Sequence, residues 1–275
     1  ARRTEITMDD SDLNIADLIP RHSCVITVSD TGYIKRVPAD TYRTQHRGGK
    51  GIIGMKTKES DYVEHLFNAD SHDLIFFFTD RGFMYWLNVY EIPEGSRTGN
   101  GKAIVNMIKV MPGEKICAML TVKKEEFEDP NKFIVMASRL GYIKKTSLSL
   151  FKNLRRTGLR ALVIEEDDDL IGAGISGNGD EILLSSRLGM ACRFDQNDDQ
   201  IRPMGRTARG VRGISLRDGD EVVGVAVVEE GKDLICVTEN GFGKRCPFDE
   251  FRVMKHRGGF GVTCYNITEK SGKLT

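Results

Sequence analysis

The chain has no apolar stretch long enough to cross a bilayer, a span that takes about 20 residues in a helix. Its first residues, ARRTEITMDDSD, are polar and contain no hydrophobic segment of the kind found in a secretory signal. These absences predict a protein that does not span a membrane and is not secreted. We therefore expect it in the cytoplasm.

Cysteine is sparse and shows no pairing pattern. The six cysteines include no C-x-x-C pair, and Cys24, Cys117 and Cys236 lie within apolar runs. This arrangement predicts reduced thiols in a core instead of a disulfide framework or a zinc site. The five histidines show no metal-ligand spacing either, so no metal site is expected.

The signatures of a self-sufficient enzyme are also missing. We find no paired carboxylates, no nucleophile beside a base and no ATP-binding loop. The segment GAGISG at 172–177 matches the dinucleotide fingerprint, but NGDEILLSS after it reads as a turn and a strand, where cofactor binding needs a helix. The chain is therefore predicted to need no cofactor and to catalyse no reaction alone.

What the sequence does contain is a fivefold repeat with a period near fifty residues. Each repeat reads as an apolar strand, a short loop with a glycine, and a second hydrophobic or basic strand, and a further strand pair closes most repeats. This pattern predicts an all-β array of blades with about four short strands each. The loop glycines are Gly32, Gly82, Gly141, Gly189 and Gly241.

The repeat also suggests the domain organisation. A uniform repeat across 275 residues favours one repeat-built domain, residues 24–275, over two unrelated ones. Residues 1–23 are treated as a lead-in segment. The repeats are placed near residues 24–73, 74–132, 133–180, 181–233 and 234–275.

Charge alternates in blocks that follow the repeat. The 40 basic and 40 acidic residues cancel overall, yet residues 139–160 hold seven Lys or Arg and no acid, and residues 165–181 hold seven acids and no base. Blocks that recur in phase with a structural unit place one sign of charge on one feature of every blade. A basic band of this kind would attract a polyanion long enough to touch several blades.

A short box in the first repeat carries a specific resemblance. QHRGGKG comprises Gln45, His46, Arg47, Gly48, Gly49, Lys50 and Gly51. Its glycines let backbone N–H groups approach phosphate, arginine can bind phosphate through two parallel bonds, and lysine adds a point charge. The box, together with DLNIADLIP, TGYIKR and KHRGGFG, resembles the C-terminal DNA-wrapping domain of the DNA gyrase A chain. This resemblance extends over essentially all of the sequence.

The resemblance implies a five- or six-bladed β-pinwheel, a propeller-like ring in which adjacent blades exchange strands. It implies double-stranded DNA as the partner, wrapped so that the holoenzyme introduces negative supercoils. It also implies assembly with the rest of the gyrase A chain and with the gyrase B chain in an A2B2 complex, near the bacterial nucleoid. ATP and Mg²⁺ belong only to that holoenzyme. Since His46 stands where the family box has Arg, we expect this position to bind phosphate more weakly.

The later repeats carry degenerate relatives of the box, and basic residues recur on the strand before each. Loop residues are favoured over strand residues as DNA contacts, because strand side chains alternate between two faces. With the box itself, the candidate contacts are Arg97, Lys102, Lys144, Lys145, Arg155, Arg156, Arg160, Arg193, Arg206, Arg209, Arg212, Lys244, Arg245, Lys255 and Arg257.

Three other readings remain open from the sequence. The C-terminal domain of the topoisomerase IV A chain shares the blades but lacks an intact box. The second reading is a propeller that binds protein, in which the charge blocks that follow the repeat would have no role in binding. Its affinity for DNA would then depend little on salt. The third reading is an enzyme with an active site in a central channel, but the sequence shows no set of catalytic residues for it.

Overall fold

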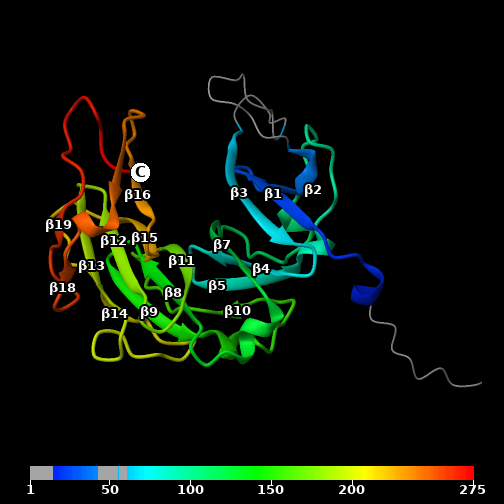
Figure 1. Cartoon of the computed structure of the whole chain (residues 1–275), viewed down its shortest axis with the longest axis horizontal. Helices are drawn as coiled ribbons and strands as arrows, with labels where there is room; N and C mark the ends of the chain where they lie inside the picture. Colours follow the sequence, from blue (N-terminus) through cyan, green and yellow to red (C-terminus); the bar gives the residue numbers. More distant parts are fainter. Residues whose placement is uncertain (1–14, 43–54, 56–60) are drawn as a thin grey trace, which may run out of the picture. The chain divides into compact units, whose positions relative to one another are not determined.

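The computed structural model describes residues 15–42, 55 and 61–275. The chain divides into two compact units, Ala1–Asp73 with Asn88–Ala103 and Leu74–Leu87 with Ile104–Thr275. Each unit is described by itself below (Figure 1). The prediction of a single repeat-built domain over 24–275 stays a prediction.

The first unit contains one four-stranded sheet, blade 1. Its central hairpin is β1 (Ser23–Ser29) and β2 (Tyr33–Pro38). The strand β3 (Val63–Asp70) pairs with β1, and the two-residue strand β6 (Lys102–Ala103) pairs with β2. All three pairings are antiparallel. Because β6 comes from the second repeat, blade 1 is completed by the repeat that follows it.

The second unit contains blades 2 to 5. Blade 2 has the strand order β10-β5-β4-β7, blade 3 β11-β8-β9-β14, and blade 4 β15-β12-β13-β18 with β19 also on β13, while β16 and β17 form blade 5. The strands are β4 (Leu74–Thr79), β5 (Phe83–Asn88), β7 (Ile116–Val122), β8 (Phe133–Ser138), β9 (Tyr142–Ser147), β10 (Leu159–Arg160), β11 (Leu170–Ser176), β12 (Glu181–Ser186), β13 (Met190–Asp195), β14 (Val211–Arg212), β15 (Val222–Val228), β16 (Asp233–Val237), β17 (Gly243–Pro247), β18 (Val253–Met254) and β19 (Val262–Thr263).

Helical structure among the described residues is limited to short 3₁₀ turns. They are η1 (Ile15–Leu18), η2 (Ala39–Thr41), η3 (Val89–Glu91), η4 (Ile104–Asn106), η5 (Lys124–Glu128), η6 (Leu148–Phe151) and η7 (Phe248–Glu250). Within this described part of the chain, no helix has the length and apolarity needed to cross a membrane.

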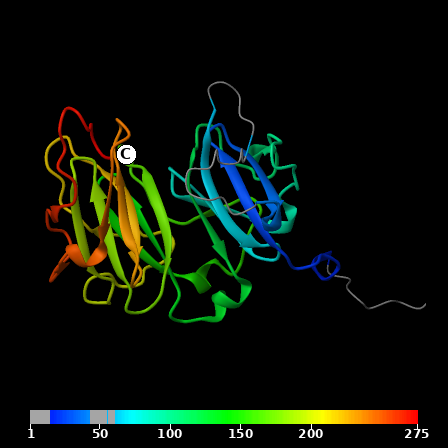
Figure 2. The same cartoon turned by 45° about the horizontal axis from the view of Figure 1, so that its top comes forward.

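The same exchange of strands recurs in the second unit. The short strands β10, β14 and β19 each pair antiparallel with the second hairpin strand of the preceding blade, β5, β9 and β13 respectively. We call β6, β10, β14 and β19 the exchanged strands. Each follows the degenerate box of its own repeat, so the box lies beside the blade before it. Figure 2 shows the hairpins of blades 3 to 5, green to orange, standing side by side in the second unit.

The apolar runs of the hairpins form the cores between blades. All six residues of β4 and all six of β8 are buried. For β8 the reason is that blade 3 shares core clusters with both blade 2 and blade 4. Phe76 and Phe78 of blade 2 share one core cluster with Ile134 and Met136 of blade 3. Burying a side chain of this size stabilises the fold by roughly 1.5–3 kcal/mol.

The strands opposite the exchanged strands pack against one another. These inner strands, β7, β11 and β15, contact each other from blade to blade. An ideal Cβ on Gly172 would lie 2.8 Å from Val225, and one on Gly174 would lie 3.1 Å from Val227. Gly172 and Gly174 of GAGISG therefore serve close packing of β11 against β15.

Candidate nucleic-acid interface

Each exchanged strand follows a short loop that contains at least one arginine, which we call a box loop. Each of the four described loops ends in a glycine of positive φ, 77° at Gly101, 84° at Gly158, 101° at Gly210 and 76° at Gly261. A Cβ on Gly101, Gly210 or Gly261 would lie 2.4, 2.5 or 2.2 Å from a backbone carbonyl oxygen of the preceding blade. The terminal glycine thus lets the loop lie against that blade. The described box loops are residues 96–101, 154–158, 205–210 and 255–261.

Two lysines on the hairpins are buried beneath box loops. Lys35 and Lys144 occupy the same place, three residues after the turn glycine, and neither side chain is exposed. The ammonium group of Lys35 donates to the carbonyl oxygens of Ser96, Arg97 and Gly99 at 3.0, 2.5 and 2.9 Å. Burial lowers the pKa of Lys35, and the nearby charge of Arg97 lowers it further.

Lys144 repeats this arrangement one unit further along the chain. Its ammonium group donates to the carbonyl oxygens of Ala161 and Arg206 at 2.7 Å each and to that of Ala208 at 3.2 Å. Burial lowers the pKa of Lys144 to about 8, and the charge of Arg206 adds to the effect. All the donors of this ammonium group point at protein oxygens.

Three more of the side chains predicted to contact DNA instead form hydrogen bonds with other groups of the protein. Lys145, 1% exposed, donates to the Gln196 carbonyl at 2.6 Å and to the Asp198 carboxylate at 3.1 Å. Arg193 bonds Glu181 and the carbonyl of Phe248 at 2.6 Å. Arg257 donates to the carbonyls of Gln200 and Arg212. Together with Lys144, these side chains are placed to hold blades and loops, whereas the sequence predicted DNA contacts.

The remaining candidates lie nearer the solvent. Arg97 and Arg206 are half-buried, as is Arg209, which pairs with Glu165. Arg245 is exposed and pairs with Asp233 at 3.2 Å. The other exposed candidates are Lys102, Arg155, Arg156, Arg160, Arg212, Lys244 and Lys255.

Several of these arginines stack on aromatic rings of the preceding hairpin. Arg160 lies 4.4 Å above the Phe83 ring, and Arg156 lies 4.4 Å above the Trp86 ring. Arg209 and Arg212 lie 3.9 and 5.0 Å from the centre of the Tyr142 ring. Stacking of this kind fixes the orientation of a guanidinium group above the ring.

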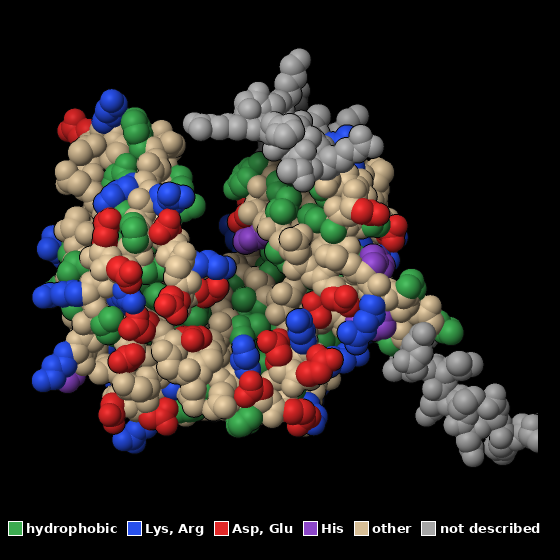
Figure 3. Space-filling model, in the orientation of Figure 1, with side chains coloured by type: hydrophobic (Ala, Val, Ile, Leu, Met, Phe, Trp, Pro, Cys, Tyr) green, Lys and Arg blue, Asp and Glu red, His purple; other side chains and the backbone are tan. Residues whose placement is uncertain are grey.

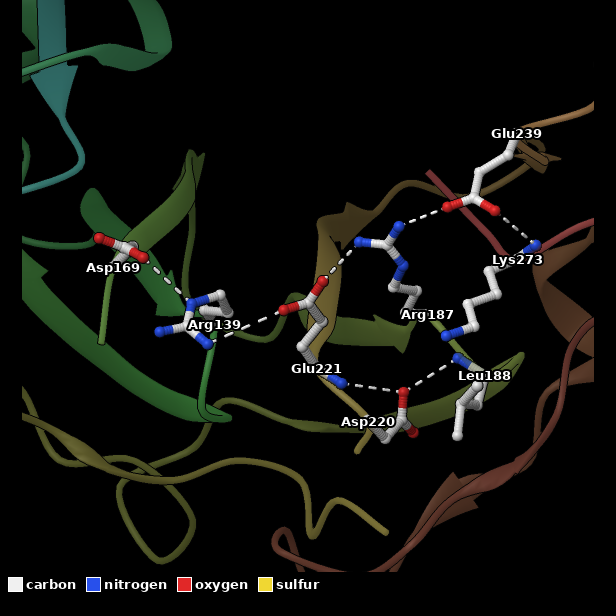
Figure 4. A network of polar contacts seen from close by, with 8 residues as sticks. All are labelled: Arg139, Asp169, Arg187, Leu188, Asp220, Glu221, Glu239 and Lys273. Atoms are coloured by element: carbon white, nitrogen blue, oxygen red, sulfur yellow. Dashed lines mark hydrogen bonds and ion pairs between the residues drawn. The ribbon is translucent and has the colours of Figure 1, made fainter. Parts of the chain in front are cut away.

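The acidic blocks have a structural use that the sequence did not reveal. Asp168 and Asp220, just before β11 and β15, accept the backbone N–H groups of Leu140 and Leu188 at 2.9 Å. Beside them an ion-pair ladder runs across blades 3 to 5, in the order Asp169, Arg139, Glu221, Arg187, Glu239 (Figure 4). The repeated SRLG at 138–141 and 186–189 was the available signal for Arg139 and Arg187.

Figure 3 shows the charged side chains on one face of the second unit. In Figure 3 Lys and Arg side chains project along its left margin, where β18 and β19 lie, while Asp and Glu gather on the face toward the viewer. The sequence box Gln45–Gly51, with His46, lies outside the described residues. Among the described residues no group of three metal-ligating side chains occurs.

Repeated sheets that take their outer strand from the next repeat define a β-pinwheel, a strand-exchanged relative of the β-propeller. A family model described as "DNA gyrase C-terminal domain, beta-propeller" matches residues 25–70, 73–123, 132–176, 180–229 and 232–275. The chain therefore belongs to this family. The all-β fold and the fivefold repeat predicted from the sequence are confirmed.

Related proteins agree with this assignment. The DNA gyrase A chain of Staphylococcus aureus (strain NCTC 8325 / PS 47) is 43% identical over 276 residues, which cover 99% of this chain and 31% of that protein. Its counterpart from Staphylococcus epidermidis (strain ATCC 12228 / FDA PCI 1200) is also 43% identical over 276 residues, 99% of this chain and 30% of that protein. The chain thus spans about a third of the length of the curated relatives it matches.

Solved structures show the same fold. A DNA gyrase A C-terminal domain superposes with a TM-score of 0.77 at 26% identity, covering 92% of this chain and 81% of that one. The C-terminal domain of a DNA topoisomerase IV superposes with a TM-score of 0.71 at 24% identity, covering 93% and 76%. This second likeness concerns the fold alone.

Proposed function

We propose that this chain binds duplex DNA along the box loops and bends it around the outer edges of the blades. The observation that carries the proposal is the recurrent position of these loops. In blades 2 to 4 each basic loop lies on the edge of the sheet opposite the inner strand. A polyanion that follows this edge meets basic groups from one blade after another.

The contacts with DNA are made mainly to phosphates. Arg155, Arg160, Arg212 and Lys255 are exposed in three successive box loops or the strands that follow them. Each phosphate neutralised releases counterions, which favours binding at low salt and conveys little sequence information. Lys144, Lys145, Arg193 and Arg257 are not retained among the proposed contacts, because protein groups occupy their donors.

Bending requires several blades to act together. Smooth bending of a short DNA site by 40–90° costs on the order of 1–6 kcal/mol, so the contacts of one loop do not offset a large wrap. In the complete protein this part would present a distant DNA segment for strand passage. The chemistry and ATP hydrolysis would come from the rest of the gyrase A chain and from the gyrase B chain in an A2B2 complex.

Salt titration of DNA binding tests the proposal. The variants Arg160→Ala and Arg212→Ala should each lower the affinity for a duplex of mixed sequence and reduce the log–log salt slope by about 0.9. Lys232→Ala is the matched control, since Lys232 is equally exposed but lies in the acidic turn before β16, paired with Glu229. A salt-independent affinity would instead support a protein-binding propeller.

Ligation of nicked circular DNA tests bending and wrapping. The chain should trap circles with a shifted linking number, and the double variant Arg160→Ala/Arg212→Ala should reduce the shift. Binding without any shift in linking number would contradict the wrapping proposal and favour a role like that of the topoisomerase IV domain.

A further inference from the structure

Lys35 and Lys144 repeat one geometry in two different blades. The acceptors of Lys35 include the carbonyls of the residues 62 and 64 positions further on, Arg97 and Gly99. The acceptors of Lys144 include the carbonyls of Arg206 and Ala208, again 62 and 64 positions further on. A recurrence at this separation shows that the contact is a property of the repeat and not an accident of one loop.

The two loops share a sequence pattern. Residues 97–101 read RTGNG and residues 206–210 read RTARG, so each has Arg-Thr, a small residue, a variable residue and the glycine of positive φ. The small residue, Gly99 or Ala208, supplies one of the carbonyls that meet the ammonium group. The pattern therefore describes a loop that folds around a cation.

Blades 2 and 4 lack both this pattern and the lysine, and blade 5 has at the equivalent position Lys244, which is exposed to solvent instead of buried. In blade 2 the equivalent position is Tyr85, whose ring would meet a Cβ on Gly158 at 2.6 Å, and its loop reads LRRTGLR. In blade 4 the equivalent position is Cys192, a buried residue whose uncharged thiol cannot replace an ammonium group, and its loop reads KHRGGFG. In blades 1 to 4 the buried lysine and the RTxxG loop thus occur together.

We propose that Lys35 and Lys144 are positioning residues for DNA binding, whose ammonium groups act as built-in cations that fix the following box loop. The carbonyls flanking Arg97 and Arg206 turn inward to the ammonium group, and the arginine side chains are left only half-buried. The lysines do not touch phosphate. This inference rests on the proposed function.

The first test needs no DNA. In Lys144→Met the amide hydrogens of residues 205–210 should exchange at least tenfold faster than in the wild type, while those of β8 and β12 keep their protection. Lys145→Met is the matched control: it removes the neighbouring buried ammonium group, whose partners are Gln196 and Asp198, outside this loop. Unchanged exchange in 205–210 for Lys144→Met would overturn the inference, whatever the chain does with DNA.

The second test is a double-mutant cycle on DNA affinity. Arg206→Ala and Lys144→Met should each weaken binding several-fold and lower the salt slope by about 0.9, and the double variant should be no weaker than the worse single variant. Additive losses would show that Lys144 makes its own phosphate contact and would overturn the inference. A loss of affinity with an unchanged slope would overturn it too, since general destabilisation alone gives that result.

A measurement on the wild type covers the case in which Lys144→Met does not fold. With ¹⁵N-labelled lysine, the ammonium protons of Lys35 and Lys144 should exchange slowly with water and keep their chemical shifts when duplex DNA is added. Shifts that move on addition of DNA, by as much as those of exposed Lys102, would overturn the inference. If the wild type does not bind DNA at all, the proposed function fails, while the exchange result still stands on its own.

Discussion

The carbonyl oxygen of Gly189 accepts the backbone N–H of Cys264 at 2.9 Å, and this bond fastens the turn of blade 4 to the end of the exchanged strand β19. The same bond recurs in blade 3, where Gly141 accepts from Gly213 at 2.8 Å, and in blade 2, where Gly82 accepts from Ala161 at 2.8 Å. The turn glycines Gly82, Gly141 and Gly189 are therefore docking points for the next repeat, and a Cβ at each would meet a backbone oxygen within 2.7 Å.

Replacing this glycine should destabilise the protein strongly. Gly189 has φ 83°, and an ideal Cβ would lie 2.1 Å from the carbonyl oxygen of Tyr265. We expect Gly189→Ala to lower the free energy of unfolding by about 3 kcal/mol, from backbone strain and displacement of the exchanged strand. Gly219→Ala is the control, because Gly219 has φ 73° but open space around its Cβ. Urea titration should show a loss of only about 1 kcal/mol there; equal losses would contradict the docking role.

The buried ammonium group of Lys144 predicts opposite effects of pH on stability and on DNA binding. Its pKa is lowered to about 8 in the folded chain by burial, so between pH 8 and 10.5 the unfolded chain binds more protons. The free energy of unfolding should therefore rise with pH in this window, by up to about 1 kcal/mol per pH unit relative to Lys144→Met. DNA affinity should fall over the same range, since a neutral amine donates fewer bonds to the loop. Parallel changes in both quantities would contradict the assignment.

The ion-pair ladder predicts a salt-sensitive contribution to the stability of blades 3 to 5. Arg187 bonds the carboxylates of Glu221 and Glu239, and these bonds raise its pKa. Arg187→Met should lower the free energy of unfolding by about 1 kcal/mol at low ionic strength, and the difference should largely disappear in 1 M salt. Lys232→Met removes an isolated exposed pair with Glu229 and should change little under either condition. Thermal unfolding at two salt concentrations makes the comparison.

The aromatic stack at Tyr142 predicts a loss of DNA affinity without a loss of phosphate contacts. Tyr142 lies beneath Arg209 and Arg212, and its hydroxyl is 3.2 Å from the Arg212 guanidinium group. Tyr142→Leu should weaken DNA binding about threefold, because an exposed stack of this kind is worth roughly 0.5–1 kcal/mol. The salt slope should stay unchanged, in contrast to Arg212→Ala. A reduced slope in Tyr142→Leu would show that the ring determines whether the phosphate is contacted at all.

Much of the fold could be predicted from local sequence. The turn glycines and the apolar runs before them mark the hairpins, because a sheet buried on both faces needs a continuous hydrophobic strand and a tight turn needs a residue of positive φ. The exchange of strands could not be read in the same way. The periodicity is the same whether residues 159–160 pair within their own repeat or with β5 of the preceding blade.

The candidate DNA interface, too, could be predicted only in part from the sequence. The basic loops were visible in the sequence. Exposure does not follow the expected preference for loop residues, since Arg160 and Arg212 in exchanged strands are exposed while Arg257 in a box loop is half-buried. Burial of Lys144 and Lys145 was not visible, since a lysine in a hairpin strand reads the same whether water or carbonyl oxygens surround its ammonium group. Likewise the acids of residues 165–169 read as a charged surface, whereas Asp168 caps a turn and Asp169 pairs with Arg139.

The order of glycines, apolar runs and charges along the chain determined by itself that this protein is a β-array of repeated blades with basic loops, because hairpin geometry and burial act over a few neighbouring residues. Only the tertiary structure decided which blade each loop completes and which cations face water. Those outcomes depend on contacts between residues some sixty positions apart, where an ammonium group with three carbonyl partners is stable in the interior and one without them is not.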